Sequence, residues 1–87
     1  MVTERQFKIS RQADKFISSL PEKERQKIKK AVSSLITGNT ESLDIKKFIG
    51  YPKEFRLRVG RIRLLFKSTP DMLFIFKAGF RKDVYRK

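Results

Sequence analysis

Residues 55–67 read FRLRVGRIRLLFK and form the most regular stretch of this 87-residue chain. Apolar residues alternate with arginines on both sides of the central glycine, which is typical of two half-buried strands joined by a tight hairpin turn. The alternation places Arg56 and Arg58 on one face of the first strand, and Arg63 joins them from the second. Because the run contains no acidic residue, this basic face is either a solvated surface or a surface that binds an anion. Arg61 lies at the turn and is the arginine most typical of ordinary surface.

The residues before the hairpin predict a short strand followed by two helices. Gln6–Ile9 alternates as a strand does, and Ser10 is suited to cap a helix whose apolar residues follow at helical spacing. Pro21 is suited to open the second helix, which carries one apolar stripe opposite a basic face. Gly38 ends it in the usual way. These elements form a helical hairpin with one apolar face.

The remaining segments complete an α+β fold. Residues 39–54 are expected to connect the second helix to the strand hairpin. Residues 72–78 are almost continuously apolar, which favours a strand buried on both faces, with Phe74 and Phe76 in the core. The predicted order is therefore β-α-α-β-β-β, with the helical hairpin packed on one face of an antiparallel sheet. We expect a single domain over residues 1–87, because a chain of this length has no room for a second core.

Charge is unevenly distributed along the chain. The 22 Lys and Arg residues outnumber the 9 Asp and Glu residues, which gives a net charge of +13. Residues 1–45 hold 9 basic and 6 acidic side chains, or +3, whereas residues 46–87 hold 13 and 3, or +10. Such a concentration indicates a polyanionic partner, most often nucleic acid, or an acidic protein. Generic solubility is the alternative.

Cysteine and histidine are both missing, and their absence narrows the possible chemistry. The chain has no cysteine and no histidine, which excludes disulfides, thiolate zinc sites, a cysteine nucleophile and the usual general base. We expect neither a metal nor a cofactor. No signal-peptide pattern and no membrane-spanning run is visible, which favours a cytoplasmic protein without a membrane partner.

Three blocks of the sequence resemble the RelE/ParE superfamily of bacterial and archaeal toxins. They are LPEKERQKIKKAV at 20–32, KKFIGYPKEFRLRVGRIRLLF at 46–66 and FRKDVYRK at 80–87. The middle block resembles the family pattern K-L-x-G…[YF]-R-[IL]-R-x-G-x-Y-R-[LV]-x-[YF], and the last resembles [HK]-R-x-x-V-Y. The blocks keep the family's order and together span nearly the whole chain, with the RelE branch the more similar.

The resemblance implies a RelE-like fold and a metal-independent endoribonuclease that cuts mRNA in the ribosomal A site. In that reaction the RNA 2′-hydroxyl attacks the adjacent phosphorus. Arg56 and Arg58 match the strand cations of the family site, and Arg63 matches the arginine that contacts the scissile phosphate. Arg81 matches the closing arginine, a candidate acid or charge stabiliser, and Tyr85 matches the closing tyrosine, a candidate base.

The resemblance also implies partners and further contacts. The expected partners are an acidic, RelB-like antitoxin and mRNA on the ribosome. Lysines around the arginines are candidate RNA contacts, although a solvated surface is the alternative for each: Lys46, Lys47, Lys53, Lys77 and Lys82. Two other functions stay open, a ParE-like toxin that inhibits DNA gyrase without cutting RNA, and an inactive relative that binds RNA or an antitoxin.

Overall fold

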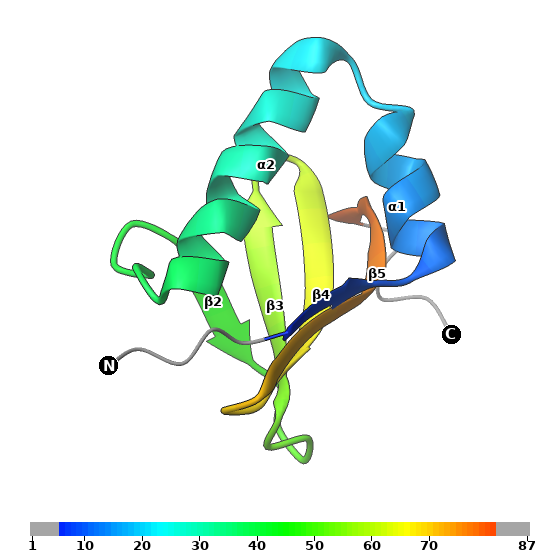
Figure 1. Ribbon diagram of the computed structural model, residues 1–87. Helices are drawn as coiled ribbons and strands as arrows, with labels where there is room; N and C mark the ends of the chain where they lie inside the picture. The colour runs from blue at the N-terminus through cyan, green and yellow to red at the C-terminus, as the bar shows by residue number, and fades with distance from the viewer. Residues whose placement is uncertain (1–5, 82–87) are drawn as a thin grey trace.

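The computed structural model describes residues 6–81, in which two helices pack on a five-stranded sheet (Figure 1). The elements are β1 Gln6–Ile9, α1 Arg11–Ser18, α2 Glu22–Thr37, β2 Asp44–Lys47, β3 Glu54–Val59, β4 Ile62–Ser68 and β5 Met72–Phe80. Both helices lie on the same side of the sheet. Within the described residues, no helix combines the length and the apolar character needed to cross a lipid bilayer.

The strands lie in the order β1-β5-β4-β3-β2 across the sheet. Strands β2 to β5 pair antiparallel in sequence, whereas β1 pairs parallel with β5, so the sheet is mixed. The predicted α+β class, with a helical hairpin on one face of the sheet, is confirmed. The parallel β1–β5 pair was not predicted, because it joins segments more than sixty residues apart and has no turn that would mark it.

Strand β2 also differs from the prediction, which treated residues 39–54 as a connecting segment. Asp44–Lys47 pairs with β3 and forms an edge of the sheet. Three of its four residues are charged, as is common on edge strands, and only Ile45 packs against the core. With one apolar residue, the segment carries no alternation that would predict a strand.

Two polar side chains fasten the start of α1 to β5. The Ser10 hydroxyl caps the helix by accepting a hydrogen bond from the Ala13 backbone N–H at 3.1 Å, and it donates one to the Phe76 carbonyl at 3.0 Å. The Gln12 side chain donates to the Ala78 carbonyl at 2.7 Å and accepts from the Ala78 N–H at 2.9 Å. Since β1 pairs with β5 only up to Ile75, the Gln12 amide takes the place that a longer β1 would fill.

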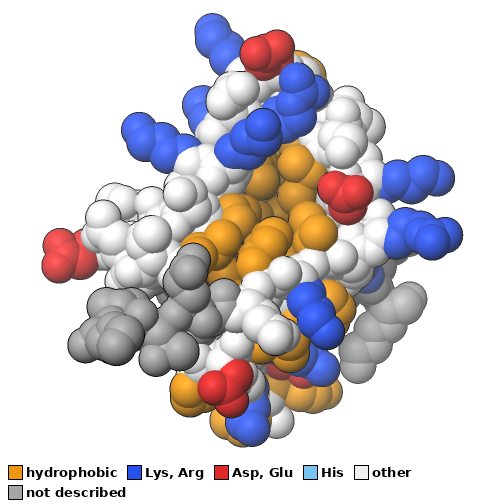
Figure 2. Space-filling view, viewed as in Figure 1, with side chains coloured by type: hydrophobic (Ala, Val, Ile, Leu, Met, Phe, Trp, Pro, Cys, Tyr) orange, Lys and Arg blue, Asp and Glu red, His pale blue; other side chains and the backbone are white. Residues whose placement is uncertain are grey.

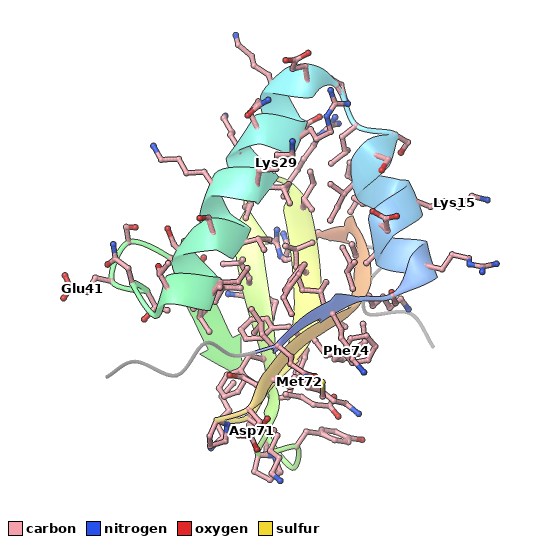
Figure 3. All side chains as sticks on the ribbon, viewed as in Figure 1. Lys15, Lys29, Glu41, Asp71, Met72 and Phe74 are labelled. Atoms are coloured by element: carbon pink, nitrogen blue, oxygen red, sulfur yellow. The ribbon has the colours of Figure 1, made fainter. Side chains whose placement is uncertain are left out.

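The core lies between the helices and the sheet. Leu57, Leu64 and Ile75 of three neighbouring strands are fully buried, and Ile28 of α2 belongs to the same core cluster on the helix side. Each such side chain contributes about 1.5–3 kcal/mol by leaving water. The polar faces of the helices point outward, as Lys15 and Lys29 show (Figure 3). The opposite face of the sheet therefore has no helix over it among residues 6–81.

Candidate functional site

Arg56, Arg58 and Arg63 lie on the uncovered side of the sheet, and we call these three residues the arginine face. Leu57 and Leu64, which pair across β3 and β4, point to the helices, so the alternating side chains point the other way. Arg58 and Arg63 are direct partners across the two strands. The structure thus brings together three arginines of the site predicted from the sequence.

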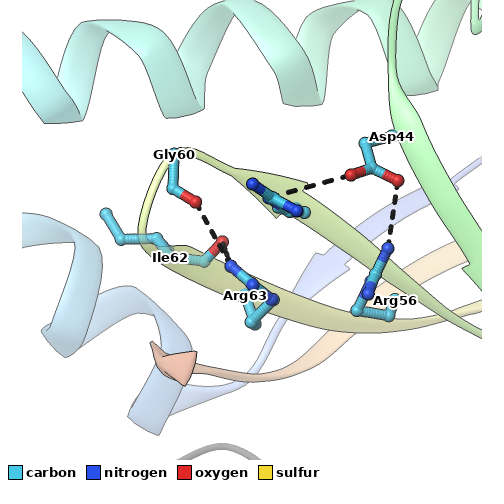
Figure 4. A network of polar contacts seen from close by, with 6 residues as sticks. Asp44, Arg56, Gly60, Ile62 and Arg63 are labelled. Carbon is cyan, nitrogen blue, oxygen red and sulfur yellow. Dashed lines mark hydrogen bonds and ion pairs between the residues drawn. The ribbon is translucent and has the colours of Figure 1, made fainter. Parts of the chain in front are cut away.

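Arg63 is unusual because it is charged and buried. Only 6% of the residue is exposed. Its Nη1 donates to the carbonyls of Gly60 at 3.2 Å and Ile62 at 3.5 Å (Figure 4). Among residues 6–81 no carboxylate forms an ion pair with it. A buried cation held only by neutral carbonyls is energetically unfavourable until an anion reaches it.

Asp44 is the site residue that the sequence did not reveal. Its carboxylate accepts a hydrogen bond from Arg56 Nη2 at 3.0 Å and lies 3.8 Å from Arg58 Nε (Figure 4). It reaches them because β2 pairs with β3 and places Asp44 opposite Arg58. Asp44 contacts two of the three guanidinium groups, and among residues 6–81 no other carboxylate pairs with the three arginines, so the arginine face keeps a net positive charge.

Two buried nitrogen atoms of the arginine face make no hydrogen bond to any of the described residues. In the described part of the chain, the buried side-chain polar atoms without a partner are Nε of Arg56 and Nε of Arg63. Buried donors in folded proteins are nearly always satisfied, so exceptions call for an explanation such as an ordered water or a ligand. Both exceptions belong to the same predicted site.

The sequence suggested that Arg61 is an ordinary surface residue, but the structure gives it specific partners. It donates two hydrogen bonds to the Glu24 carboxylate of α2, at 2.8 and 2.9 Å, and its guanidinium lies 4.8 Å from the centre of the Phe80 ring. The hydrogen bonds lower the pKa of Glu24 and raise that of Arg61. Arg61 therefore ties the β3–β4 turn to α2 and to the end of β5.

The two closing residues of the predicted site fall at the limit of the description. Arg81 directly follows β5, and its backbone N–H donates to the Arg61 carbonyl at 3.3 Å. It lies two positions after Gly79, the cross-strand partner of Arg63, so it is close in the fold to the arginine face. Tyr85 and Lys82 lie outside the described residues.

The candidate RNA-binding lysines do not all share one face. Lys46 pairs with Arg56, and Lys77 pairs with Leu65 next to Arg63, so both lie on the side of the arginine face. Lys47 pairs with Phe55 and lies on the opposite side. Lys53 lies in the β2–β3 connection, at the far end of β3 from Arg58.

Two aromatic residues predicted to be core lie beside the cations instead. Phe74 and Phe76 are half-buried and absent from the core cluster. Phe74 pairs with Lys67, and the Lys67 amine lies 5.8 Å from the centre of the Phe76 ring. A register shift in the β4–β5 ladder next to Phe66 accompanies this arrangement. Rings next to cations are surfaces on which unpaired bases can stack.

A mixed sheet covered on one side by a helical hairpin is the architecture that this chain shares with RelE-like toxin structures. The chain is similar to RelE in the RelB–RelE antitoxin–toxin complex from Methanococcus jannaschii, with 25% identity, a TM-score of 0.75 and coverage of 90% of this chain and 94% of that one. It is also similar to RelE in the RelE–RelB complex from Pyrococcus horikoshii, with 22% identity, a TM-score of 0.77 and coverage of 94% and 100%.

A third similar structure is the Escherichia coli DinJ–YafQ toxin–antitoxin complex, at 17% identity and a TM-score of 0.77, covering 97% of this chain and 100% of that one. No protein-family model matches the sequence, and no curated protein matches it closely enough to be a relative. The resemblance predicted from the sequence is thus confirmed by the fold, which is that of a RelE-like toxin.

Proposed function

We propose that the chain, acting as one domain, is the toxin of a type II toxin–antitoxin pair and a metal-independent endoribonuclease. Its substrate is mRNA in the A site of the ribosome, which places it in the cytoplasm. The observation that carries this proposal is the pair of buried Nε donors on Arg56 and Arg63, which have no hydrogen-bond partner among residues 6–81. Each unsatisfied donor costs about 1–3 kcal/mol, a cost that an incoming phosphodiester would remove.

The reaction needs positive charge more than it needs a metal. The RNA 2′-oxygen forms a bond to phosphorus, the bond from phosphorus to the 5′-oxygen breaks, and a cyclic phosphate remains. Negative charge grows on the phosphorane oxygens between these events. Fixed guanidinium groups in a site with little water stabilise that charge without having to reorganise. Arg63 and Arg58, paired across the strands, are suited to this role.

Two protons must also move, one from the 2′-hydroxyl and one to the leaving 5′-oxygen. Arginine keeps its proton at any working pH, so it cannot be the base. We assign the base to Tyr85 and the stabilisation of the leaving oxygen to Arg81, as the family resemblance implies. Lys46 and Lys77 would hold the flanking phosphates, since both lie on the side of the arginine face.

The proposed antitoxin would also bind the helix side of the molecule, opposite the arginine face. A groove of about 340 Å³ runs between the two helices and β1, with Phe7, Ile17, Val32 and Ile36 among the residues that line it and Lys29 on its rim. Figure 2 shows apolar side chains gathered in a hollow between the two helices, with Lys and Arg side chains along part of its edge and an acidic side chain beside it. An amphipathic helix of an acidic antitoxin suits such a groove, and the similar structures from Methanococcus jannaschii and Pyrococcus horikoshii are complexes of a toxin with its antitoxin.

The test is expression in a bacterial host with primer extension on host mRNA, repeated with purified translating ribosomes. We expect cleavage within codons by the natural chain and a loss of at least about 100-fold with Arg63→Met. The methionine fills the buried volume without the charge. Removing an uncompensated buried charge leaves stability unchanged or higher, so a folded but inactive variant is the expected result.

Arg11→Met is the matched control, because Arg11 is an exposed arginine of α1, away from the arginine face. It should cleave within about twofold of the natural chain. Growth arrest with intact mRNA and gyrase-linked DNA breaks would contradict the proposal and favour a ParE-like toxin. Cleavage that persists with Arg63→Met would contradict the assigned site.

A further inference from the structure

The connection between β2 and β3 holds two exposed apolar side chains in a fixed loop. Ile49 is 98% exposed and Tyr51 is 55% exposed, and within residues 6–81 the other large apolar residue of this kind is Phe7. Exposed apolar side chains at the tip of a small basic protein are unfavourable for solubility. No described residue bonds to the Tyr51 hydroxyl.

The loop is ordered by its own backbone. Phe48 N–H donates to the Glu54 carbonyl at 3.1 Å, Tyr51 N–H donates to the Phe48 carbonyl at 3.3 Å, and Glu54 N–H donates to the Tyr51 carbonyl at 3.0 Å. Gly50, with a φ of 86°, supplies the left-handed conformation that the turn requires. Ser68 N–H fixes the end of the loop by donating to the Lys53 carbonyl at 2.9 Å. The tyrosine ring is therefore presented on a rigid support.

Beside the ring lies an open hollow of about 240 Å³, lined by Gly50, Tyr51, Pro52, Lys53, Glu54 and Lys67. It combines a tyrosine ring and a proline ring with two lysine amines. Lys67 is half exposed and its amine lies 4.0 Å from a Glu54 carboxylate oxygen. Flat apolar surfaces bordered by amines suit a nucleotide, whose base stacks and whose phosphate pairs with the cations.

The hollow opens on the same side of the sheet as the arginine face. Glu54 lies on the same face of β3 as Arg56 and Arg58, because the three are two residues apart along the strand. The cross-strand partner of Glu54 is Lys67, and that of Arg58 is Arg63. The two pairs are four residues apart along both strands. At about 3.3 Å per residue this separation is about 13 Å, which a few nucleotides of an extended strand can span.

Granted the RNA-cleaving function above, we propose that Tyr51 and Lys67 form a second nucleotide subsite that stacks an unpaired base of the RNA a few nucleotides from the scissile phosphate. Lys53 and Lys67 neutralise the phosphate next to that base, and Ile49 covers the outer edge of the stack. This subsite contributes to affinity and to the choice of cleavage position, and it takes no part in the chemical step.

The experiment measures binding of the purified chain to a fluorescein-labelled, single-stranded 2′-O-methyl RNA of ten nucleotides, which cannot be cleaved by 2′-hydroxyl attack. Stacking on one aromatic ring contributes about 1–3 kcal/mol, so Tyr51→Ala should raise Kd by about 5- to 150-fold. Tyr51→Phe keeps the ring and should bind within about twofold. Gln26→Ala removes an exposed, uncharged side chain of α2 on the helix side and is the matched control.

An abasic scan of the same RNA then locates the base. One abasic position should weaken binding of the natural chain as much as Tyr51→Ala does, with little further loss when the two are combined. Equal affinity of Tyr51→Ala and the natural chain would overturn the subsite, and so would a loss of antitoxin binding with RNA affinity unchanged. Absence of RNA binding by the natural chain would instead contradict the proposed function itself. Failure of the natural chain to cleave mRNA on purified translating ribosomes would contradict it too.

Discussion

The three arginines of the arginine face carry more positive charge than the neighbouring carboxylate of Asp44 neutralises. Arg58 and Arg63 are like charges directly opposite each other, a pairing that weakens a sheet. Asp44 offsets part of this repulsion through its contacts with Arg56 and Arg58. The same carboxylate holds both guanidinium groups in place and competes with any phosphate that approaches them.

Asp44→Asn tests this competition. The amide removes the negative charge and leaves the shape of the side chain, so we expect single-stranded RNA to bind about three- to tenfold more tightly, or about 1 kcal/mol. The binding constant should also fall more steeply with salt, because about one more phosphate contact releases its counterions. Fluorescence anisotropy at several salt concentrations measures both.

Asp71→Asn, at the exposed β4–β5 turn, is the control. Weaker RNA binding by Asp44→Asn would show that Asp44 acts mainly by orienting the arginines and not by competing with phosphate.

Elements of this small protein are joined by side chains where backbone pairing ends. Gln12 of α1 bonds to both polar backbone groups of Ala78, beyond the last β1–β5 pair. Arg61 at the β3–β4 turn bonds to Glu24 of α2. Such contacts fix the hairpin and the strands relative to one another, and so they fix the platform that carries the arginine face.

Loss of the Gln12 contact should destabilise the fold measurably. Gln12→Ala leaves the N–H and carbonyl of Ala78, itself 1% exposed, without partners. We expect a loss of about 1–3 kcal/mol, read as a lower midpoint of urea unfolding with an unchanged slope. Gln26→Ala on the exposed part of α2 should change stability by less than about 0.5 kcal/mol. Equal effects of the two substitutions would refute the strand-like role of Gln12.

The Glu24–Arg61 contact predicts a pH dependence of stability. The hydrogen bonds from Arg61 lower the pKa of Glu24 below its ordinary value of 4.5, so the folded state binds this proton less tightly than the unfolded state. The contribution is complete above that ordinary value and is lost as the pH falls through the folded-state pKa. Thermal unfolding from neutral pH down to pH 3 should therefore show a smaller drop in Tm for Glu24→Gln than for the natural chain. Glu41→Gln, whose side chain points away from the molecule (Figure 3), should behave like the natural chain.

Over the whole molecule, a net charge of +13 on 87 residues opposes compactness. Most of this excess lies in residues 46–87, the half of the chain that contains the end of β2 and all of β3 to β5. Self-repulsion of this kind destabilises a folded domain and at the same time speeds its association with a polyanion. The free chain should accordingly be less stable than the same chain bound to RNA or to an acidic protein.

Salt should reveal this repulsion. Raising NaCl shortens the screening length from about 30 Å at 0.01 M to about 8 Å at 0.15 M, so Tm should rise over this range. The double substitution Lys15→Glu and Lys29→Glu reverses two outward-pointing side chains (Figure 3) and lowers the net charge from +13 by four, to +9. It should raise Tm at low salt and reduce the effect of salt. A Tm that is independent of salt in the natural chain would show that the charges do not limit stability.

Local rules determined a large part of this protein from its sequence. The period of two along residues 55–67 placed Arg56, Arg58 and Arg63 on one face, because side chains on a strand alternate whatever the strand pairs with. Ser10 and Gly38 marked helix ends for equally local reasons, a hydroxyl that accepts an N–H and a glycine with a φ of 81°. The helical hairpin and the strand hairpin followed from these signals.

Only the tertiary structure decided which distant segments meet. Three contacts join positions that are far apart in the sequence. They are the parallel β1–β5 pair, the pairing of edge strand β2 that brings Asp44 to Arg56 and Arg58, and the contact of Arg61 with Glu24. The burial of Arg63 was also decided by the tertiary structure. Arg63 and the exposed Arg58 both alternate with apolar residues in the sequence, so the sequence does not distinguish them. Periodicity fixes the direction of a side chain, but its partners and its exposure depend on how the whole chain packs.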